Sequence, residues 1–286
     1  MQAYGYYDAV SPRRGFSPPA VFASDRPLVF GHRGGAKIGP ENTVLAFARG
    51  LAAGADGFEC DVRLSADGVP VVIHDATLDR TTDRHGPVGA LTAEELGRID
   101  ATCRFAPSAP GQAVSEVIGV PTLRDVLQRF PAARVIIELK DTQAALAEAV
   151  AEVVRQCEGG GRVCVGSFDR PVLEHLRAVA PEIVTSASRP EAQWTLARSW
   201  LPFPRFGPAR YRAFQIPERS GRLHVARPAF VRQAHREGAV VQVWTVDDPR
   251  DVERLLAFGV DGIISDRPDW TVPARDAWVA ARRADI

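Results

Sequence analysis

The sequence lacks the features that define several large classes of protein. Its four cysteines, Cys60, Cys103, Cys157 and Cys164, show no CxxC spacing, so we expect no disulfide framework and interpret each as a small buried hydrophobe. No apolar run approaches the roughly 20 residues that span a bilayer, so no integral membrane segment is expected. The 35 basic and 35 acidic residues give a net charge of +0, and this balance argues against nucleic acid as a partner.

The N-terminal segment also lacks a recognisable targeting signal. It has no basic start followed by an apolar stretch, and the segment after Arg13-Arg14 is not apolar. We therefore expect a loosely packed leader over residues 1–25, a single domain over residues 26–286 and a location in the cytoplasm. An α/β barrel commonly takes a chain of this length as one unit.

Apolar runs typical of β-strands alternate with helical patterns along this domain. The predicted strands cover residues 28–32, 57–63, 134–140, 162–167, 183–186, 213–216, 240–245 and 262–265. The predicted helices cover residues 43–53, 122–130, an Ala-rich stretch ending near 157, 171–179, 191–200, 228–237, 249–258, and a closing helix from Trp270 or a little later. Eight strands, each followed by a helix, predict a (β/α)8 TIM barrel.

A hairpin interrupts this alternation after the second strand. Asp67-Gly68 lies between two apolar runs, which is a strong hairpin signal, so residues 69–73 should fold back as an arm above the second strand. Residues 77–119 then form a long insertion, with a short helix predicted over 91–96 and irregular structure over 105–119. Long loops inside a compact domain are usually functional or disordered, and we interpret this one as a small cap.

Charged side chains gather at the predicted carboxyl ends of the first three strands, where barrel enzymes carry their catalytic residues. Glu59 and Asp61 are two residues apart on a strand, so both project from one face with Cα atoms roughly 7 Å apart, and Glu138 shares a face with Lys140. The hairpin should bring His74 over the two carboxylates. The predicted rim thus holds His32, Arg33, Glu59, Asp61, His74, Glu138 and Lys140.

Two interpretations of this rim are possible. One is an ion-pair network around Lys140 inside the barrel, because burying this much charge is costly unless the charges are paired. The other is metal-assisted chemistry, which we favour because an ion-pair network has no need for two histidines. Carboxylate oxygens suit hard cations, whereas zinc sites usually include histidine or cysteine.

The sequence resembles the glycerophosphodiester phosphodiesterase family from about Leu28 to Pro268. The similarity lies in nine short motifs that occur in the family's order, which makes a chance match very unlikely. They are His32-Arg33-Gly34, Pro40-Glu41-Asn42-Thr43, Glu59-x-Asp61, Asp67-Gly68 to His74-Asp75, Leu78-x-Arg80-Thr81-Thr82, Pro121-Thr122-Leu123, Glu138-Leu139-Lys140, Val243-Trp244-Thr245-Val246 and Asp261-Gly262-Ile263-Ile264-Ser265-Asp266.

The resemblance implies metal-dependent hydrolysis of small glycerophosphodiesters to sn-glycerol 3-phosphate and an alcohol. It implies that Glu59, Asp61 and Glu138 bind one divalent cation, Mg²⁺ or Ca²⁺, and that residues 77–119 are the family's cap. It also implies that His32 and His74 are the general acid/base pair and that Arg33 and Lys140 contact the phosphate. Which histidine is the acid, and whether water or the substrate's adjacent hydroxyl is the nucleophile, stay open.

Other residues have less specific interpretations. Trp244 either fills the core or forms an apolar wall for the substrate's alcohol. Glu41 and Asn42 are expected at the start of the first helix as structural or supporting residues. We expect Asp75 to orient a neighbour. His85, His175, His224 and His235 are expected at the surface or in the cap.

Two alternative functions remain. A lysophospholipase D would need an apolar path for an acyl chain, which could be formed by Trp200, Leu201, Phe203 and Phe206 with Phe105 and Val114 of the cap opposite. A non-catalytic barrel that binds phosphate or lipid headgroups would not need the two histidines, so we consider it the weaker alternative. The sequence indicates nothing about the oligomeric state.

Overall fold

The computed structural model describes residues 17–109, 111–200 and 209–284. Eight of its strands pair in parallel in the order β6-β5-β4-β2-β1-β11-β10-β7. A single parallel bridge between Ser186 and Ala213 connects the two ends of this order and nearly closes the barrel. The strands are β1 (Leu28–Gly31), β2 (Gly57–Leu64), β4 (Arg134–Leu139), β5 (Val163–Gly166), β6 (Val184–Thr185), β7 (Ala213–Pro217), β10 (Val240–Trp244) and β11 (Gly262–Ser265). The predicted TIM barrel is confirmed.

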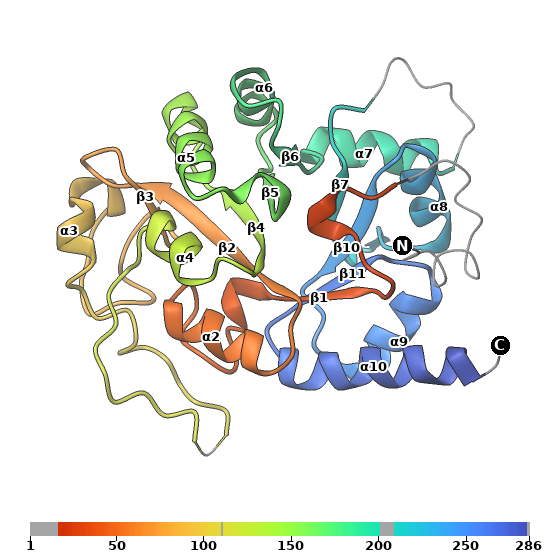
Figure 1. The fold of residues 1–286 in the computed structure, drawn as a ribbon, viewed down its shortest axis with the longest axis horizontal. Coiled ribbons are helices and arrows are strands. Elements are labelled where there is room, and N and C mark those ends of the chain that lie inside the picture. Colours follow the sequence, from red (N-terminus) through yellow and green to blue (C-terminus); the bar gives the residue numbers. More distant parts are fainter. Residues whose placement is uncertain (1–16, 110, 201–208, 285–286) are drawn as a thin grey trace.

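Helices follow the barrel strands and lie outside them. In Figure 1, α2 and α10 lie along the lower side of the strands, and α5, α6 and α7 along the upper side. The helices are α2 (Val44–Ala52), α4 (Leu123–Arg129), α5 (Ala144–Gln156), α6 (Arg170–Val179), α7 (Arg189–Arg198), α8 (Pro228–Arg236), α9 (Pro249–Ala257) and α10 (Pro268–Ala284). Short 3-10 turns occur at η1 (Ala20–Phe22), η2 (His32–Gly34), η3 (Val88–Ala90) and η4 (Gly159–Gly161).

Polar caps and prolines set where the helices begin. Thr43 accepts a hydrogen bond from the backbone of Ala46 at the start of α2, and Thr122 forms a capping box with Asp125 at the start of α4. The closing helix begins at Pro268, so its predicted start at Trp270 or later is wrong. Proline suits the first helical position because its missing N–H needs no partner there.

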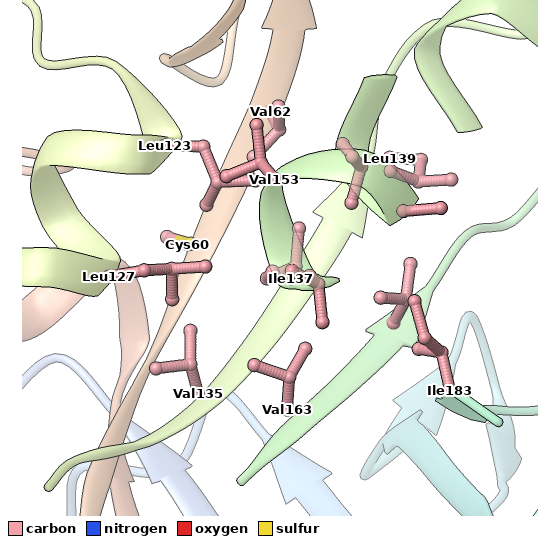
Figure 2. Close-up of a cluster of buried hydrophobic side chains, with 14 of the residues drawn as sticks. Cys60, Val62, Leu123, Leu127, Val135, Ile137, Leu139, Val153, Val163 and Ile183 are labelled. Atoms are coloured by element: carbon pink, nitrogen blue, oxygen red, sulfur yellow. The ribbon is translucent and has the colours of Figure 1, made fainter. Parts of the chain in front are cut away.

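Side chains alternate between the barrel interior and the helix layer. Figure 2 shows Cys60 and Val62 of β2 beside Leu123 and Leu127 of α4, with Val153 of α5 nearby. This alternation directs apolar residues outward into the helix packing. The intervening residues of β2 and β4 are left to face the barrel interior.

The burial of individual residues corrects two predictions. Val21 and Phe22 are buried against a cluster that includes Leu28 and Phe30, so residues 17–25 of the predicted leader are partly packed core; residues 1–16 lie outside the described part. Cys60 and Cys164 are buried as expected and Cys157 is half-buried, but Cys103 is exposed because it lies in the irregular part of the cap.

The predicted hairpin is confirmed. β3 (Pro70–Val72) pairs antiparallel with β2, with Val62 opposite Val72, and Gly68 takes a φ of 76° in the turn. The cap leaves the barrel beside β2 and β3, away from β7 and β10 (Figure 1). Its helix is limited to α3 (Ala93–Leu96), and its own small core includes Leu78, Val88, Leu96 and Val120.

A second hairpin was not predicted. β8 (Arg219–Ser220) pairs antiparallel with β9 (Leu223–His224) directly after β7. Each strand has two residues, which is too short for an alternating pattern to be recognised in the sequence.

No helix in the described ranges combines the length and apolar character needed to cross a membrane.

Candidate active site

A cavity of about 710 Å³ opens at the carboxyl ends of the barrel strands, where the catalytic groups of such barrels lie. All seven side chains predicted for the rim line it, together with Trp244. They are His32, Arg33, Glu59, Asp61, His74, Glu138, Lys140 and Trp244. The structure therefore brings the predicted residues to one place.

The register of β2 and β4 positions the three carboxylates. Asp61 is the direct partner of Glu138 across the two parallel strands, and Glu59 lies two residues before Asp61 on the same face. Gly166 of β5 makes room for Glu138, because a Cβ there would lie 2.7 Å from Ser186 Oγ and 3.0 Å from Glu138 Oε2.

Asp61 is surrounded by donors. Asn42 Nδ2 donates to Asp61 Oδ2 at 2.8 Å, and Lys140 Nζ lies 2.9 Å from Asp61 Oδ1. Burial alone would raise the pKa of Asp61, but the charges of Lys140 and Arg33 outweigh it and lower the pKa. Asp61 is therefore held as a carboxylate.

Glu59 and Glu138 are in the opposite situation. Burial, followed by the charge of Asp61, raises the pKa of Glu59 to about 7. Burial raises the pKa of Glu138 to about 8, with the charges of Glu59 and Asp61 adding to it and that of Lys140, whose Nζ lies 4.0 Å away, opposing it. The positive side chains around the two glutamates are therefore too few to keep their pKa values at the usual level.

This oxygen-only donor set suits a hard divalent cation such as Mg²⁺ or Ca²⁺ in its chemistry. Within the described ranges, no group of three or more histidine, cysteine, aspartate or glutamate side chains is already arranged as a metal cage. Lys140 Nζ instead contacts Asp61 and approaches Glu138.

Arg33 lies in a tight turn directly after β1. Its backbone is in the left-handed region, with φ 51° and ψ 30°, and its N–H donates to Glu59 Oε2 at 3.0 Å. Nη1 donates to Glu41 Oε1 at 2.7 Å. Nε lies 3.2 Å from Asp61 Oδ2 but forms no hydrogen bond with the described residues, so this buried donor has capacity for another acceptor.

His32 is oriented by a residue that follows the neighbouring strand β11. Its Nδ1 lies 2.7 Å from Asp266 Oδ1, directly after β11, and its Nε2 lies 3.9 Å from Glu59 Oε2. Burial would lower the pKa of His32, but the hydrogen bond to Asp266 and the charge of Glu59 outweigh it and raise the pKa. This arrangement leaves Nε2 as the nitrogen on the carboxylate side.

His74 has a similar aspartate partner. Its Nδ1 lies 2.6 Å from Asp75 Oδ1, and Asp75 Oδ2 accepts from Arg80 Nε at 2.5 Å. Burial lowers the pKa of His74, and Arg33 and Lys140 add to that effect. The pKa of Asp75 falls to about 2 because the hydrogen bonds from Arg80 and His74 outweigh its burial.

Arg80 connects the cap to the site. It donates to both carboxylate oxygens of Glu41 at 2.7 Å, and Glu41 in turn accepts from Arg33. A continuous chain of charged contacts thus runs from Arg33 through Glu41 and Arg80 to Asp75 and His74.

Sequence reasoning gave no role to Asp266 or Arg80, although both lie in the motifs quoted for the resemblance. The pairs Asp266 with His32 and Arg80 with Glu41 are distant in sequence, so no local pattern indicates them. Asn42 and Glu41 act as supporting residues, and Thr43 is the helix cap. The predicted orienting role of Asp75 agrees with its contact to His74.

The opposite wall of the cavity contains Trp244 and Phe168. Their rings meet edge to face, with centroids 6.0 Å apart and planes at 88°. Trp244 is partly buried against the core and also lines the cavity, so both interpretations of this residue describe part of its position.

The remaining histidines lie outside this cavity, as far as the structure describes its lining. His85 and His224 are exposed. The surface prediction is wrong for His235, whose side chain is 10% exposed and whose Nε2 lies 2.8 Å from Asp261 Oδ2. It packs there because α8 turns this side chain toward the start of β11.

The acyl path considered from the sequence is not supported by the described residues. Leu201, Phe203 and Phe206 lie outside the described part of the chain. Trp200 packs under the guanidinium of Arg227, 4.4 Å from the ring centroid, and neither Trp200, Phe105 nor Val114 is among the described residues that line the cavity.

Comparison with known proteins agrees with this geometry. Residues 32–270 match the model of the glycerophosphoryl diester phosphodiesterase family. A glycerophosphodiester phosphodiesterase of Caldanaerobacter subterraneus is 31% identical over 247 residues, which cover 85% of this chain and 95% of the relative.

Solved structures show the same similarity. A glycerophosphodiester phosphodiesterase from Agrobacterium tumefaciens superposes with a TM-score of 0.70 at 31% identity, covering 86% of this chain and 98% of that one. A phosphodiesterase from Oleispira antarctica, solved in complex with the product sn-glycerol-3-phosphate, superposes with a TM-score of 0.67 at 25% identity, covering 88% and 97%.

Proposed function

Because this chain belongs to the glycerophosphoryl diester phosphodiesterase family, we propose that it hydrolyses small glycerophosphodiesters to sn-glycerol 3-phosphate and an alcohol, using one divalent cation and two histidines. The observation that carries the proposal is the convergence of two aspartate-oriented histidines and three carboxylates on one cavity. The product named for the Oleispira antarctica structure supports the same substrate class.

In this proposal, Glu59, Asp61 and Glu138 hold Mg²⁺ or Ca²⁺. The raised pKa values of Glu59 and Glu138 support a cation here, since both side chains are buried together with too little positive charge nearby. When bound, such a cation supplies electrophilic stabilisation of the charge that develops on the phosphate.

Arg33 and Lys140 are proposed to bind the non-bridging oxygens of the phosphate. Arg33 Nε has hydrogen-bonding capacity, and Lys140 Nζ is held over the carboxylates as a compact point charge. Donors that are fixed before the reaction stabilise the transition state more than the ground state, because the added charge appears where they already point.

His32 and His74 are proposed to move the protons. One removes a proton from the attacking nucleophile, and the other protonates the alcohol oxygen as its bond to phosphorus breaks. In both residues an aspartate engages Nδ1, which directs Nε2 to proton transfer. Asp266 and Asp75 therefore act as positioning residues.

The test is an assay of glycerophosphocholine, glycerophosphoethanolamine and glycerophosphoglycerol with Mg²⁺, Ca²⁺ or EDTA, in which released sn-glycerol 3-phosphate is measured. We expect turnover with at least one cation and none with EDTA. A lysophosphatidylcholine should be at least tenfold poorer in kcat/KM. No turnover of any diester with either ion would instead favour a non-catalytic phosphate-binding barrel. A higher kcat/KM for the lysophosphatidylcholine than for the diesters would favour lysophospholipase D.

A further inference from the structure

The charges that line the cavity are distributed unevenly. Among the described lining residues, the carboxylates are Glu59, Asp61 and Glu138, which all lie at the β2–β4 side. The part formed by β7, α7 and the β8–β9 hairpin contributes two arginines, Arg189 and Arg219, and no described carboxylate. We call this part of the cavity the arginine arm.

Arg189 is placed where a cation is not favoured by its own helix. It is the first residue of α7, and the positive end of a helix dipole disfavours a cation at that position. Its guanidinium is exposed and lies over the ring of Phe168, 5.0 Å from the centroid. The contact with Phe168 offsets part of this unfavourable interaction, and the guanidinium stays exposed where it lines the cavity.

Arg219 is only weakly neutralised. Its side chain is 60% exposed, and its Nε lies 3.6 Å from Glu218 Oε1. The same Glu218 oxygen lies 3.1 Å from Arg254 Nη2, so two guanidinium groups share one carboxylate. Glu218 itself is not among the described residues that line this cavity.

The arginine arm is poorly suited to a cationic alcohol such as choline or ethanolamine. An ammonium group is usually bound by a carboxylate or by an open aromatic face. The arm supplies no described carboxylate, and the ring of Phe168 already has Arg189 at 5.0 Å and Lys140 Nζ at 5.9 Å. A further cation would meet repulsion there.

An anionic alcohol fits the same surroundings. Guanidinium groups bind phosphate oxygens in a bidentate manner. Gln193 and Ser220, both exposed, line the same arm and offer neutral polar groups that suit the hydroxyls of a polyol. Leu223 of β9 adds an apolar edge.

We propose that the preferred substrates are glycerophosphodiesters whose alcohol carries a further phosphate, which Arg189 and Arg219 bind in the arginine arm. This inference rests on the proposed function, because the second phosphate is recognised only if the first lies over Glu59, Asp61 and Glu138. Arg189 and Arg219 are then specificity residues, and they do not touch the bond that breaks.

Three substrates test the proposal: glycerophosphoglycerol, the same compound with a phosphate on its terminal hydroxyl, and glycerophosphocholine. We expect kcat/KM to be highest for the phosphorylated diester and lowest for the choline diester. Each of Arg189→Gln and Arg219→Gln should lower the ratio of phosphorylated to unphosphorylated kcat/KM by about 1.4- to fivefold, which is the typical effect of an exposed ion pair. Added salt should lower the same ratio in the native protein.

Arg222→Gln is the matched control, because Arg222 is exposed in the turn of the same hairpin and is not among the residues that line the cavity. It should leave the ratio unchanged. Two results would overturn this inference and leave the proposed function intact. One is that glycerophosphocholine has the highest kcat/KM of the three substrates. The other is that the Arg189 and Arg219 variants lose kcat/KM equally for all three. Absence of hydrolysis of all three would overturn both.

Discussion

The two sides of the barrel mouth differ in how their polar groups are arranged. On the side of β1, β2 and β4, almost every charged side chain contacts another: Arg33 with Glu41, Lys140 with Asp61, and His74 with Asp75. On the side of β7, α7 and β10, the cavity wall consists of aromatic, apolar and amide groups with exposed arginines at its edge. The first side is rigidly specified by mutual contacts, whereas the second has room for variation in the alcohol.

This difference suggests a division of labour within one phosphodiesterase cavity. Groups that bind the phosphate and move protons must hold their positions to a fraction of an ångström, and interlocking ion pairs provide that. Groups that choose the alcohol need complementarity of charge and shape but touch no reacting atom. Changes on the first side should therefore reduce kcat, and changes on the second should mainly alter KM and substrate preference.

The largest effect is expected for the two histidines. His32→Ala and His74→Ala should each lower kcat by about 10² to 10⁴, because general acid–base catalysis contributes that much. Calorimetry should show nearly native cation affinity in both variants, whereas Glu59→Gln, Asp61→Asn and Glu138→Gln should weaken it. His85→Ala is the control, since His85 is exposed in the cap and paired with Asp79. Equal loss of cation affinity in the histidine variants would mean that the ligands are assigned wrongly.

A smaller loss is expected when the support of a histidine is removed. Asp266→Asn keeps the size of the side chain but replaces the acceptor that holds His32 Nδ1 at 2.7 Å. We expect kcat to fall about 10- to 100-fold, the range typical of partners that orient a functional histidine, with KM nearly unchanged. The pH profile of kcat should also shift, because the hydrogen bond that Asp266 accepts from His32 helps to raise the pKa of His32. If the variant is less stable but keeps the native kcat and pH profile, the role of Asp266 is only structural.

The buried glutamates make the metal-free protein sensitive to pH. The pKa of Glu138 is raised in the folded state to about 8, so between about pH 5 and 8 the folded protein binds more protons than the unfolded chain. Its free energy of unfolding should therefore fall as the pH rises, by up to about 1.4 kcal/mol per pH unit for this one group.

Denaturant unfolding in EDTA at several pH values measures this slope. Glu138→Gln should flatten it, because the amide does not ionise, and Mg²⁺ or Ca²⁺ should offset the loss of stability at the higher pH values. An unchanged slope in Glu138→Gln would show that the glutamate is not held protonated in the metal-free fold.

Features set by residues close together in the sequence could be predicted, and features set by residues far apart in the sequence could not. The period of two along β2 and β4 was enough to predict that Glu59, Asp61 and Glu138 face the same interior, and Asp67-Gly68 predicted the return of the chain toward His74. These are local rules of strand and turn geometry. The barrel followed from counting such local units.

Contacts between elements far apart in the sequence were beyond this reasoning. The pairing of Asp266 with His32 requires β11 to lie beside β1 in a specific register, with Ser265 opposite Gly31. The pairing of Arg80 with Glu41 depends on how the cap folds back. The β8–β9 hairpin, which supplies Arg219, has strands too short to produce a period. The contacts that orient the proposed catalytic groups were therefore the part that needed coordinates.

The smallest effect is expected for Trp244, which belongs to the second side of the mouth. Its ring lines the cavity and meets Phe168 edge to face. Aromatic pairs contribute about 0.5 to 1.5 kcal/mol beyond simple burial, so Trp244→Ala should raise KM about two- to tenfold while kcat stays within a factor of about two. Trp244→Phe should leave KM close to the native value, because it preserves an apolar ring at the wall.

Trp194→Ala serves as the control for Trp244→Ala, since Trp194 is exposed and is not among the described residues of the cavity lining. The measurement is kcat and KM for glycerophosphoglycerol in all three variants. A fall of more than about 100-fold in kcat for Trp244→Ala at unchanged KM would place Trp244 with the reacting groups, and the division between the two sides of the mouth would then be wrong.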